Sequence, residues 1–197
     1  MEGVELVDCF CYLGDVIQRD GGCGRAVRER VRKGWGKFRE LGGVLCNKRI
    51  DLKMRGAVYR ACVRTVMMYG AESWPVKKED EEVLVRAERR MVRMMCGVTL
   101  ANRERSADLL GRLGLKEAIA DGVRKARLRW FGHVARREGE VGIRRVLAYE
   151  VKGKVGRGKP RRTWYEVVKR ELSLVEGDAL DRGKWRKTIR DIPANPR

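Results

Sequence analysis

The chain has 197 residues, a mass of 22.6 kDa and a formal net charge of +19 at pH 7. Hydrophobic residues make up 43% of it, which excludes a wholly disordered chain, and no run of 18 apolar residues occurs, so we expect no membrane-spanning helix. The first residues lack a basic stretch followed by an apolar stretch, so we expect no secretory signal. The pI near 10.2 predicts a polyanionic partner, most often nucleic acid.

The excess of positive charge is spread along the chain. The first 20 residues carry a net charge of −4, and the remaining 177 residues carry +23. Arginine supplies 32 of the 46 basic residues, and its guanidinium group suits bidentate contact with phosphate. This distribution favours an extended phosphate-facing surface over a single basic tail. The alternative explanation is a GC-rich coding sequence, which raises the arginine and glycine content without any function.

Patterns in chain order predict a mainly α fold, a helical array with a short amino-terminal β-hairpin. Residues 4–19 are rich in β-branched and aromatic residues and are interrupted by Gly14-Asp15, which predicts two strands joined by a tight turn. From residue 26 onward, apolar residues recur every three or four positions, which predicts helices. The expected helices cover residues 26–45, 51–69, 79–94, 106–113, 116–137, 163–175 and 179–191.

Apolar spacing also predicts which side chains face the core. The inner face of helix 79–94 is expected to carry Leu84, Ala87, Met91 and Met94. Trp130 and Trp164 have inner-face spacing in their own helices, so burial is the first interpretation for both. The outer faces are expected to be basic, with residues 124–129 and 136–137 supplying much of that charge.

The six cysteines show neither the CxxC pairs of a zinc site nor an export signal, so we expect reduced, buried thiols. Asp8, Asp15 and Asp20 are interpreted as turn formers and surface acids rather than as a metal cluster. We therefore expect no metal site and no cofactor. The cysteines are Cys9, Cys11, Cys23, Cys46, Cys62 and Cys96.

Catalytic patterns are scarce, so no catalytic residue is predicted. A triad would have to use His133, the one histidine of the chain, and no acid lies near it in the sequence. Neither a GxSxG elbow nor a phosphate-binding GxxxxGK[ST] or GxGxxG loop occurs. The glycines of residues 21–24 are interpreted as a linker, because no Lys-Ser or Lys-Thr follows them.

Contact with nucleic-acid phosphates is better supported than catalysis. Residues 152–162 hold six bases, three glycines and one proline without an acid, which predicts a basic loop. Bases alternate with aromatic residues around Trp130 and Trp164, where exposed rings would stack on bases. The predicted phosphate-binding residues are, in order of preference, Lys152, Lys154, Arg157, Lys159, Arg161 and Arg162 of the loop, then Arg129 and His133, then Arg28, Arg32 and Lys33.

Six sequence strings, taken together and in order, resemble the carboxy-terminal part of a non-LTR (LINE-type) retrotransposon reverse transcriptase. Each string alone is weak, but all six in the same order are specific, and they extend over about residues 7–190. They are residues 10–17 (FCYLGDVI), 68–74 (MYGAESW), 89–93 (RRMVR), 127–134 (RLRWFGHV), 156–164 (GRGKPRRTW) and 181–186 (DRGKWR).

The resemblance implies three regions. Residues 1–23 would be a β-hairpin at the end of the polymerase palm, residues 24–97 would be thumb-like helices that hold a primer–template duplex, and residues 98–197 would be a basic helical downstream region. The family's catalytic pair of adjacent aspartates has no match in this sequence, and neither does its Cys/His knuckle. The fingers and most of the palm would lie in an upstream part of the polymerase.

The sequence therefore predicts a nucleic-acid-binding fragment of a retrotransposon RNA-directed DNA polymerase, without its catalytic aspartates. Its expected partners are RNA and/or DNA, held through phosphates, and the missing upstream polymerase part; no membrane partner is expected. The alternatives are a degenerate or mis-split retroelement remnant with no independent activity, and a basic protein-interaction module. The sequence leaves open the choice among RNA, DNA and hybrid ligands, and between nucleus and cytoplasm.

Overall fold

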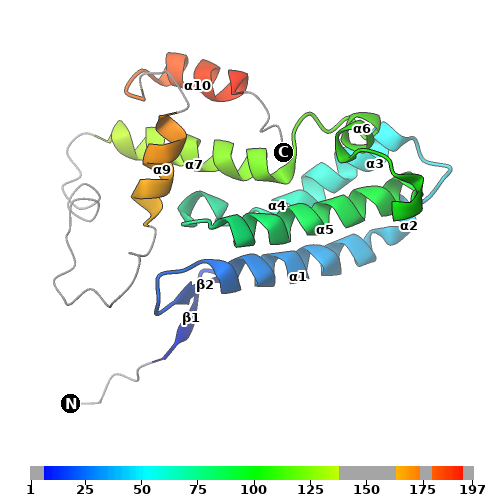
Figure 1. Ribbon diagram of the computed structural model, residues 1–197, viewed down its shortest axis with the longest axis horizontal. Helices are drawn as coiled ribbons and strands as arrows, with labels where there is room; N and C mark the ends of the chain where they lie inside the picture. Colours follow the sequence, from blue (N-terminus) through cyan, green and yellow to red (C-terminus); the bar gives the residue numbers. More distant parts are fainter. Residues whose placement is uncertain (1–6, 138–162, 174–178, 193–197) are drawn as a thin grey trace.

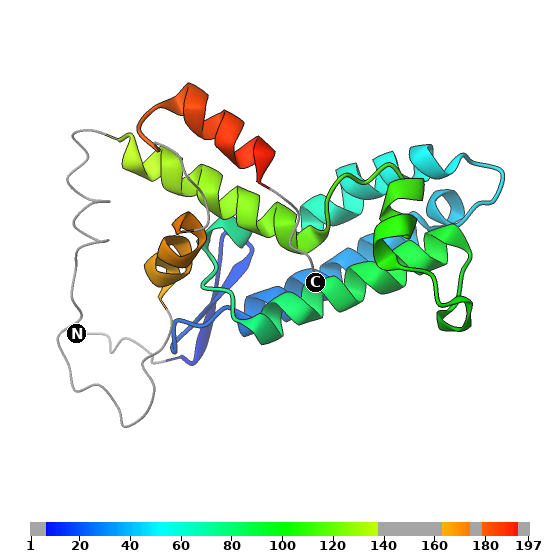
Figure 2. The ribbon, with the colours of Figure 1, turned by 45° about the horizontal axis from the view of Figure 1, so that its top comes forward.

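The computed structural model describes residues 7–137, 163–173 and 179–192, and it has the predicted architecture: helices packed as an array, with an antiparallel β-hairpin at the amino-terminal end (Figure 1). The helices form a lower layer of long, nearly aligned segments and an upper layer that lies over one end of it (Figures 1 and 2). The fold class predicted from the sequence is therefore confirmed.

The hairpin pairs β1 (Cys9–Tyr12) with β2 (Asp15–Gln18), with Tyr12 opposite Asp15. The turn residues are Leu13 and Gly14, with φ angles of +48° and +78°, so both occupy the left-handed region of a type I′ turn. The prediction placed the turn one residue later, at Gly14-Asp15. Asp15 instead opens the second strand, because a two-residue turn matches the twist of the paired strands.

Three long segments build the lower layer. Helix α1 (Gly24–Glu40) runs parallel to α5 (Lys78–Cys96), since Cys23 lies beside Asp80 and Trp35 lies beside Arg90. The third segment is continuous and consists of α3 (Leu52–Val58), a π-helical stretch η1 (Tyr59–Arg64) and α4 (Thr65–Met67). It runs antiparallel to α1, and Gly34 allows the close approach because a Cβ there would overlap the Met67 side chain.

Local sequence explains where these segments begin and end. The Asp51 carboxylate accepts hydrogen bonds from the backbone N–H groups of Lys53 and Met54 at 2.8 and 3.3 Å, so it is the predicted N-cap of α3. Gly97 ends α5 in the left-handed conformation. Short elements connect the long ones: α2 (Gly42–Leu45), η2 (Ala71–Ser73), η3 (Leu100–Asn102) and α6 (Ser106–Arg112).

Helix α7 (Ile119–Ala135) joins the two layers. Its first half contributes Ile119 and Val123 to a large core cluster that also contains residues of α1, η1, α5 and α6. Its second half supports α9 (Trp164–Leu172) and α10 (Arg182–Asp191). This core includes side chains from both sides of the predicted boundary between residues 97 and 98, and the three-region division stays a prediction.

A smaller core cluster holds α10 on α7. It consists of Leu128 together with Trp185, Ile189 and Ile192. The Trp185 indole N–H donates to the Leu128 carbonyl at 3.0 Å, and its ring lies where a Cβ on residue 132 would be. Gly132 is therefore required for α10 to pack so closely, which explains why strings 127–134 and 181–186 contain a glycine and a tryptophan.

Several predicted positions in the core are wrong. Trp130 is 41% exposed and Met94 is 46% exposed, while Met95, the next residue, is buried. Arg127, predicted on a basic outer face, is only 3% exposed. Arg127 is buried because α5, α9, α10 and η2 all pack against α7, so more than one face of this helix is covered and a single apolar stripe does not define its inner side.

The six cysteines are free thiols that differ in exposure, and Cys9, Cys62 and Cys96 are half-buried. Cys11 and Cys46 are exposed, so the expectation of burial is wrong for them, whereas Cys23 is buried. Burial, reinforced by the neighbouring Asp80 carboxylate, raises the pKa of the Cys23 thiol to about 12, which makes it a poor nucleophile. Among the helices that the structure describes, none is long and apolar enough to cross a membrane.

Candidate nucleic-acid interface

The first-ranked phosphate-binding residues, those of the basic loop, lie outside the described residues. These are Lys152, Lys154, Arg157, Lys159, Arg161 and Arg162. The structure therefore places the loop's neighbours but not the loop itself. The second- and third-ranked residues are described, and they lie on α7 and α1 respectively.

The third-ranked residues separate into two sides of α1. Arg28 and Arg32 are both exposed and lie one turn apart, so they share a stripe. Lys33 is about 100° further around the helix, and its ammonium group is 3.5 Å from the Gly14 carbonyl of the hairpin turn. Arg32 also forms a salt bridge of 2.7 Å with Glu29, whereas Arg28 forms no ion pair with a carboxylate of the described residues. Lys33 thus does not join the other two.

An arginine row on α5, which the prediction treated as a solvated face, extends the Arg28/Arg32 stripe. Arg86, Arg89 and Arg90 are exposed and Arg93 is half-buried, and none of them forms an ion pair within the described part of the chain. The Arg90 guanidinium lies 5.4 Å above the Trp35 ring of α1, at the seam between the two helices. We call the combined surface the α1–α5 basic face, made up of Arg28, Arg32, Arg39, Arg86, Arg89, Arg90 and Arg93.

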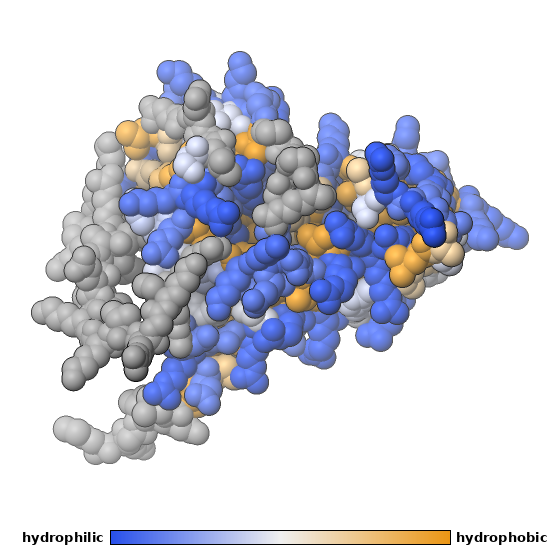
Figure 3. Space-filling model, viewed as in Figure 1, coloured by the Kyte–Doolittle hydropathy of each residue, from blue (hydrophilic) through white to orange (hydrophobic). Residues whose placement is uncertain are grey.

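Hydrophilic side chains cover α1 and α5 on the side shown in Figure 3. Arg39 is exposed and has no ion-pair partner among the described residues, as is the case for Arg28. The nearest acids on the same helices are engaged with bases, because Glu29 pairs with Arg32 and Glu82 lies 4.0 Å from Lys78. Positive charge on this face is therefore largely uncompensated, which is the electrostatic arrangement that attracts a polyanion.

Four arginines lie in the interior of the protein, so they do not contribute to the phosphate-facing surface that the net charge predicts. Arg30, Arg55, Arg64 and Arg127 are each at most 7% exposed. Arg64 and Arg127 form buried ion pairs with Glu88 and Glu171, and Arg55 donates to the Met95 carbonyl at 2.6 Å. Most of the other described arginines remain at the surface, so the coherent basic face survives this internal use.

The second-ranked residues lie together at the far end of α7. Arg129 and His133 are exposed and one helical turn apart, so both point to the same side of the helix. Trp130 stacks on His133 with a ring-centroid distance of 5.4 Å and an interplanar angle of 29°. The structure thus brings Arg129 and His133 together and adds an exposed indole to them.

The hairpin turn and the segment around η2 are held together by contacts between strings 10–17 and 68–74. The Tyr69 hydroxyl donates to the Leu13 carbonyl at 3.0 Å, and the Trp74 indole N–H donates to Asp15 at 3.0 Å. Gly70 has φ +77°, and a Cβ on it would press on the Asp15 carboxylate. These residues therefore attach the hairpin to the helices, which a two-stranded sheet needs for stability.

Arg30 completes this junction from α1. Its guanidinium donates to the Gly14 carbonyl at 2.7 Å, lies 3.9 Å from the Asp15 carboxylate and sits 4.1 Å above the Tyr69 ring. Sequence reasoning missed this residue because it is one of many arginines in α1. The signal that would have found it is its position on the same helical side as Ala26 and Gly34, which are buried.

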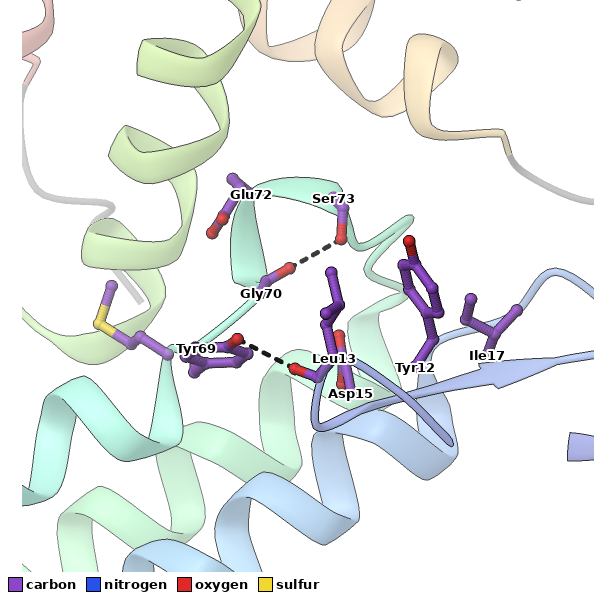
Figure 4. A pocket seen from close by; sticks show the side chains of 9 residues that line it. Tyr12, Leu13, Asp15, Ile17, Tyr69, Gly70, Glu72 and Ser73 are labelled. Carbon is purple, nitrogen blue, oxygen red and sulfur yellow. Dashed lines mark hydrogen bonds between the residues drawn. The ribbon is translucent and has the colours of Figure 1, made fainter. Parts of the chain in front are cut away.

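A hollow of about 460 Å³ lies between the hairpin turn and η2. The side chains of Tyr12 and Ile17 form one wall, and Tyr69 and Glu72 lie on the other side (Figure 4). It holds two carboxylates, Asp15 and Glu72, and no base, so it differs in charge from the α1–α5 basic face. Its acidic lining disfavours phosphate, and we place no nucleic-acid contact in it.

String 156–164 reaches the same junction through its last residue. The Trp164 indole N–H donates to the Glu72 carbonyl at 2.7 Å, so α9 is attached to the segment next to the hairpin. Trp164 is half-buried, which agrees with its inner-face spacing. Helix α7 also packs directly against η2. The described parts of these strings therefore have structural contacts, and their resemblance alone assigns no binding role to them.

We expect the attachment of α9 to α7 to weaken as pH rises. Glu171 pairs with Arg127 in the interior, and burial raises the pKa of its carboxyl to about 7 from an ordinary value of 4.5. The folded state binds the Glu171 proton more tightly than the unfolded state does. The protonated carboxyl therefore makes its full contribution to the free energy of unfolding below pH 4.5, and this contribution is lost as pH rises through 7. Urea unfolding at pH 5 to 8 should show the wild type losing on the order of 3 kcal/mol relative to Glu171→Gln. A pH-independent difference between the two proteins would contradict this.

The part of the chain that the structure describes contains no group of three or more His, Cys, Asp or Glu residues arranged to hold a metal ion. The three aspartates considered at the start are dispersed. Asp15 binds Trp74, Asp8 lies 3.8 Å from Arg19, and Asp20 accepts from the backbone of Gly22 at 3.0 Å. Asp8 and Asp20 are surface acids with partners nearby in the sequence, whereas Asp15 is half-buried, opens β2 and binds a distant segment, so its interpretation as a turn and surface acid is wrong.

The chain is similar to an uncharacterized transposon-derived protein of Caenorhabditis elegans, with 26% identity over 206 aligned residues that cover 96% of this chain and 72% of the relative. No family model matches the chain, and no solved structure matches it. The relationship therefore points to a transposon origin, and the geometry described above supports a protein with a helical core and a basic surface.

Proposed function

We propose that this protein is a nucleic-acid-binding segment derived from a retrotransposon polymerase, and that it contributes binding without catalysis. The observation that supports this most is the α1–α5 basic face, whose arginines on two parallel helices are mostly free of acid partners within the described residues. Adjacent helices lie about 8–10 Å apart, so two rows of guanidinium groups would contact phosphates along two lines. The transposon-derived relative supports the retroelement part of the proposal.

Binding would depend on backbone phosphates and would discriminate little between sequences. In this proposal the basic loop, with Lys152, Lys154, Arg157, Lys159, Arg161 and Arg162, acts with the α1–α5 basic face. Each phosphate contact releases counterions, so affinity falls steeply with salt. The partner that would supply the polymerase chemistry is the upstream part of the same polymerase, which carries the aspartate pair missing from this sequence.

Fluorescence anisotropy with a labelled 20-base-pair RNA duplex between 50 and 200 mM KCl tests the proposal. The logarithm of the binding constant should fall with the logarithm of salt concentration, with a slope of about −0.9 per phosphate contact. We expect Arg86→Gln/Arg90→Gln/Arg93→Gln to reduce the slope by roughly 2 to 3, since each glutamine removes one such contact. Neutralising the six loop bases should reduce it further.

The matched control removes the same three positive charges from a different part of the surface. Lys48→Gln/Arg49→Gln/Lys53→Gln removes three exposed bases near the start of α3, away from the α1–α5 basic face. We expect this variant to retain the wild-type slope to within about one contact. Equal losses in the two triple variants would mean that net charge, and not this face, determines binding. A binding constant that does not respond to salt would reject phosphate contact altogether.

A second candidate is a retroelement remnant with no independent activity, which the transposon origin of the relative favours. It predicts a chain that folds but binds no nucleic acid at 50 mM KCl. Circular dichroism together with the same anisotropy measurement separates the two candidates. An open reading frame for fingers and palm directly upstream in the genome would instead indicate a mis-split polymerase gene.

A further inference from the structure

An exposed aromatic pair, Trp130 and His133, lies on α7. Of the five tryptophans, Trp74 and Trp185 are at most 2% exposed and Trp35 and Trp164 are half-buried, whereas Trp130 is 41% exposed. A single exposed indole is common on protein surfaces, but this one is held beside a second exposed ring, so the two together present a broad aromatic surface to solvent. Its partner ring, His133, is exposed as well.

We infer that Trp130 and His133 form a stacking platform for an unpaired base of single-stranded nucleic acid. The two rings already lie nearly parallel, with their centroids 5.4 Å apart and 29° between their planes. A flat heteroaromatic base placed on this pair would continue the stack. Every base has a π-face, so the platform would accept any base sequence.

Charge around the platform fits a strand of phosphates. Arg129 is exposed, forms no ion pair in the described part of the chain, and lies one turn from His133 on the same side of α7. A base on the Trp130 ring would therefore have a guanidinium group within reach of its flanking phosphate. The aromatic–cation combination is typical of sites for single strands, and a duplex would not use it, because its bases are already stacked on one another.

The inference rests on the proposed function, and it adds a prediction that phosphate binding alone does not make. Phosphate binding by the α1–α5 basic face predicts comparable affinity for any polyanion of equal charge. A stacking platform predicts in addition that single strands lose affinity when the indole is removed, while duplexes do not. Loss of phosphate binding and loss of the indole-dependent preference for single strands can therefore be told apart by experiment.

The experiment compares fluorescein-labelled 20-nucleotide oligouridylate with a 20-base-pair RNA duplex, using the full chain at 100 mM KCl. We expect Trp130→Ala to weaken oligouridylate binding by roughly 5- to 150-fold, the range for loss of one stacked base, and to change duplex binding by less than about twofold. Trp130→Phe retains an aromatic face and should recover part of the loss. Oligouridylate should also quench the tryptophan fluorescence of the wild type, and Trp130→Phe should abolish most of that quenching.

Tyr165→Ala is the matched control. Tyr165 is also 41% exposed and lies on a helix, but Lys169 lies 5.2 Å above its ring. We expect this variant to bind oligouridylate as the wild type does. Equal losses for Trp130→Ala and Tyr165→Ala, or an unchanged oligouridylate affinity in Trp130→Ala, would overturn the platform. Unchanged affinity with a steep salt dependence would do so while leaving the proposed function intact. Thermal unfolding confirms that each variant is folded.

Discussion

Replacing Glu88 by glutamine is expected to lower the free energy of unfolding by about 3–5 kcal/mol. Glu88 is 3% exposed and connects three segments of the core. One carboxylate oxygen accepts from Arg64 at 2.7 and 2.9 Å and lies 3.4 Å from the Tyr59 hydroxyl. The other accepts from the backbone N–H of Ile119, the first residue of α7, at 2.7 Å.

The size of the effect follows from the charge that would be left behind. The Arg64 guanidinium is buried, and a neutral amide at position 88 would leave its charge without a counter-charge, with only the neutral Glu117 carbonyl at 2.6 Å and the amide oxygen as acceptors. An uncompensated buried charge is far more costly than a missing hydrogen bond between neutral groups. Glu88 also joins α5 to the start of α7, so we expect the upper layer to loosen together with the core.

Urea unfolding followed by circular dichroism measures the effect of Glu88→Gln. Glu104→Gln is the comparison, because Glu104 forms a 2.8 Å salt bridge with Arg112 in which both side chains are substantially exposed. We expect this variant to lose less than about 1 kcal/mol, as is typical of surface pairs. Similar losses for the two variants would mean that Glu88 does not have the connecting role described here.

Replacing Gly56 by alanine is expected to destabilise the protein by about 3 kcal/mol, at the upper end of the range for overpacking. Gly56 is buried in α3, and a Cβ there would overlap the backbone carbonyl of Leu113 at the end of α6. A flexible side chain could rotate away from the added methyl group, but a backbone carbonyl cannot. The two helices would have to separate, and core contacts around Leu113 would be lost.

Gly36→Ala provides a control in which the same chemical change has the opposite sign. Gly36 lies in the middle of α1, and nothing is within 4 Å of the position that its Cβ would take. Alanine is a better helix former than glycine by about 1 kcal/mol, so we expect this variant to be more stable than the wild type. Thermal unfolding of both variants compares them directly. A stabilised Gly56→Ala would show that α3 and α6 are not packed as described.

Regular elements could be predicted from sequence because their signals are local. The Asp51 cap, the apolar periodicity of α1 and the β-branched residues of the hairpin each involve neighbouring positions, and all were found. The predicted turn lies one residue too late. The reason is that Leu13 adopts the left-handed conformation, which is uncommon for residues other than glycine and asparagine. The charge and its spread along the chain were equally evident from composition alone.

The candidate interface could be predicted only in part. The spacing of Arg28 and Arg32 put both on one side of a helix, and the structure agrees, but Lys33 lies on another side. The arginine row of α5 received little weight, because an exposed basic helix face is usually only solvated. The arginine row of α5 belongs to a larger basic face because α5 packs beside α1. The periodicity of the α5 sequence does not reveal which helix packs beside it.

The sequence by itself determined that this protein is a basic, mainly helical molecule with a hairpin at its amino-terminal end, because composition and local periodicity are properties of neighbouring residues. Only the tertiary structure decided which arginines are structural and which are available to a ligand. Arg64 and Arg86 both lie in amphipathic helical stretches of the sequence. In the structure Arg64 is buried and paired with Glu88, whereas Arg86 faces solvent. That difference depends on which helix faces pack together, because a buried charged side chain without a partner costs several kcal/mol, and here another segment of the chain supplies the partner.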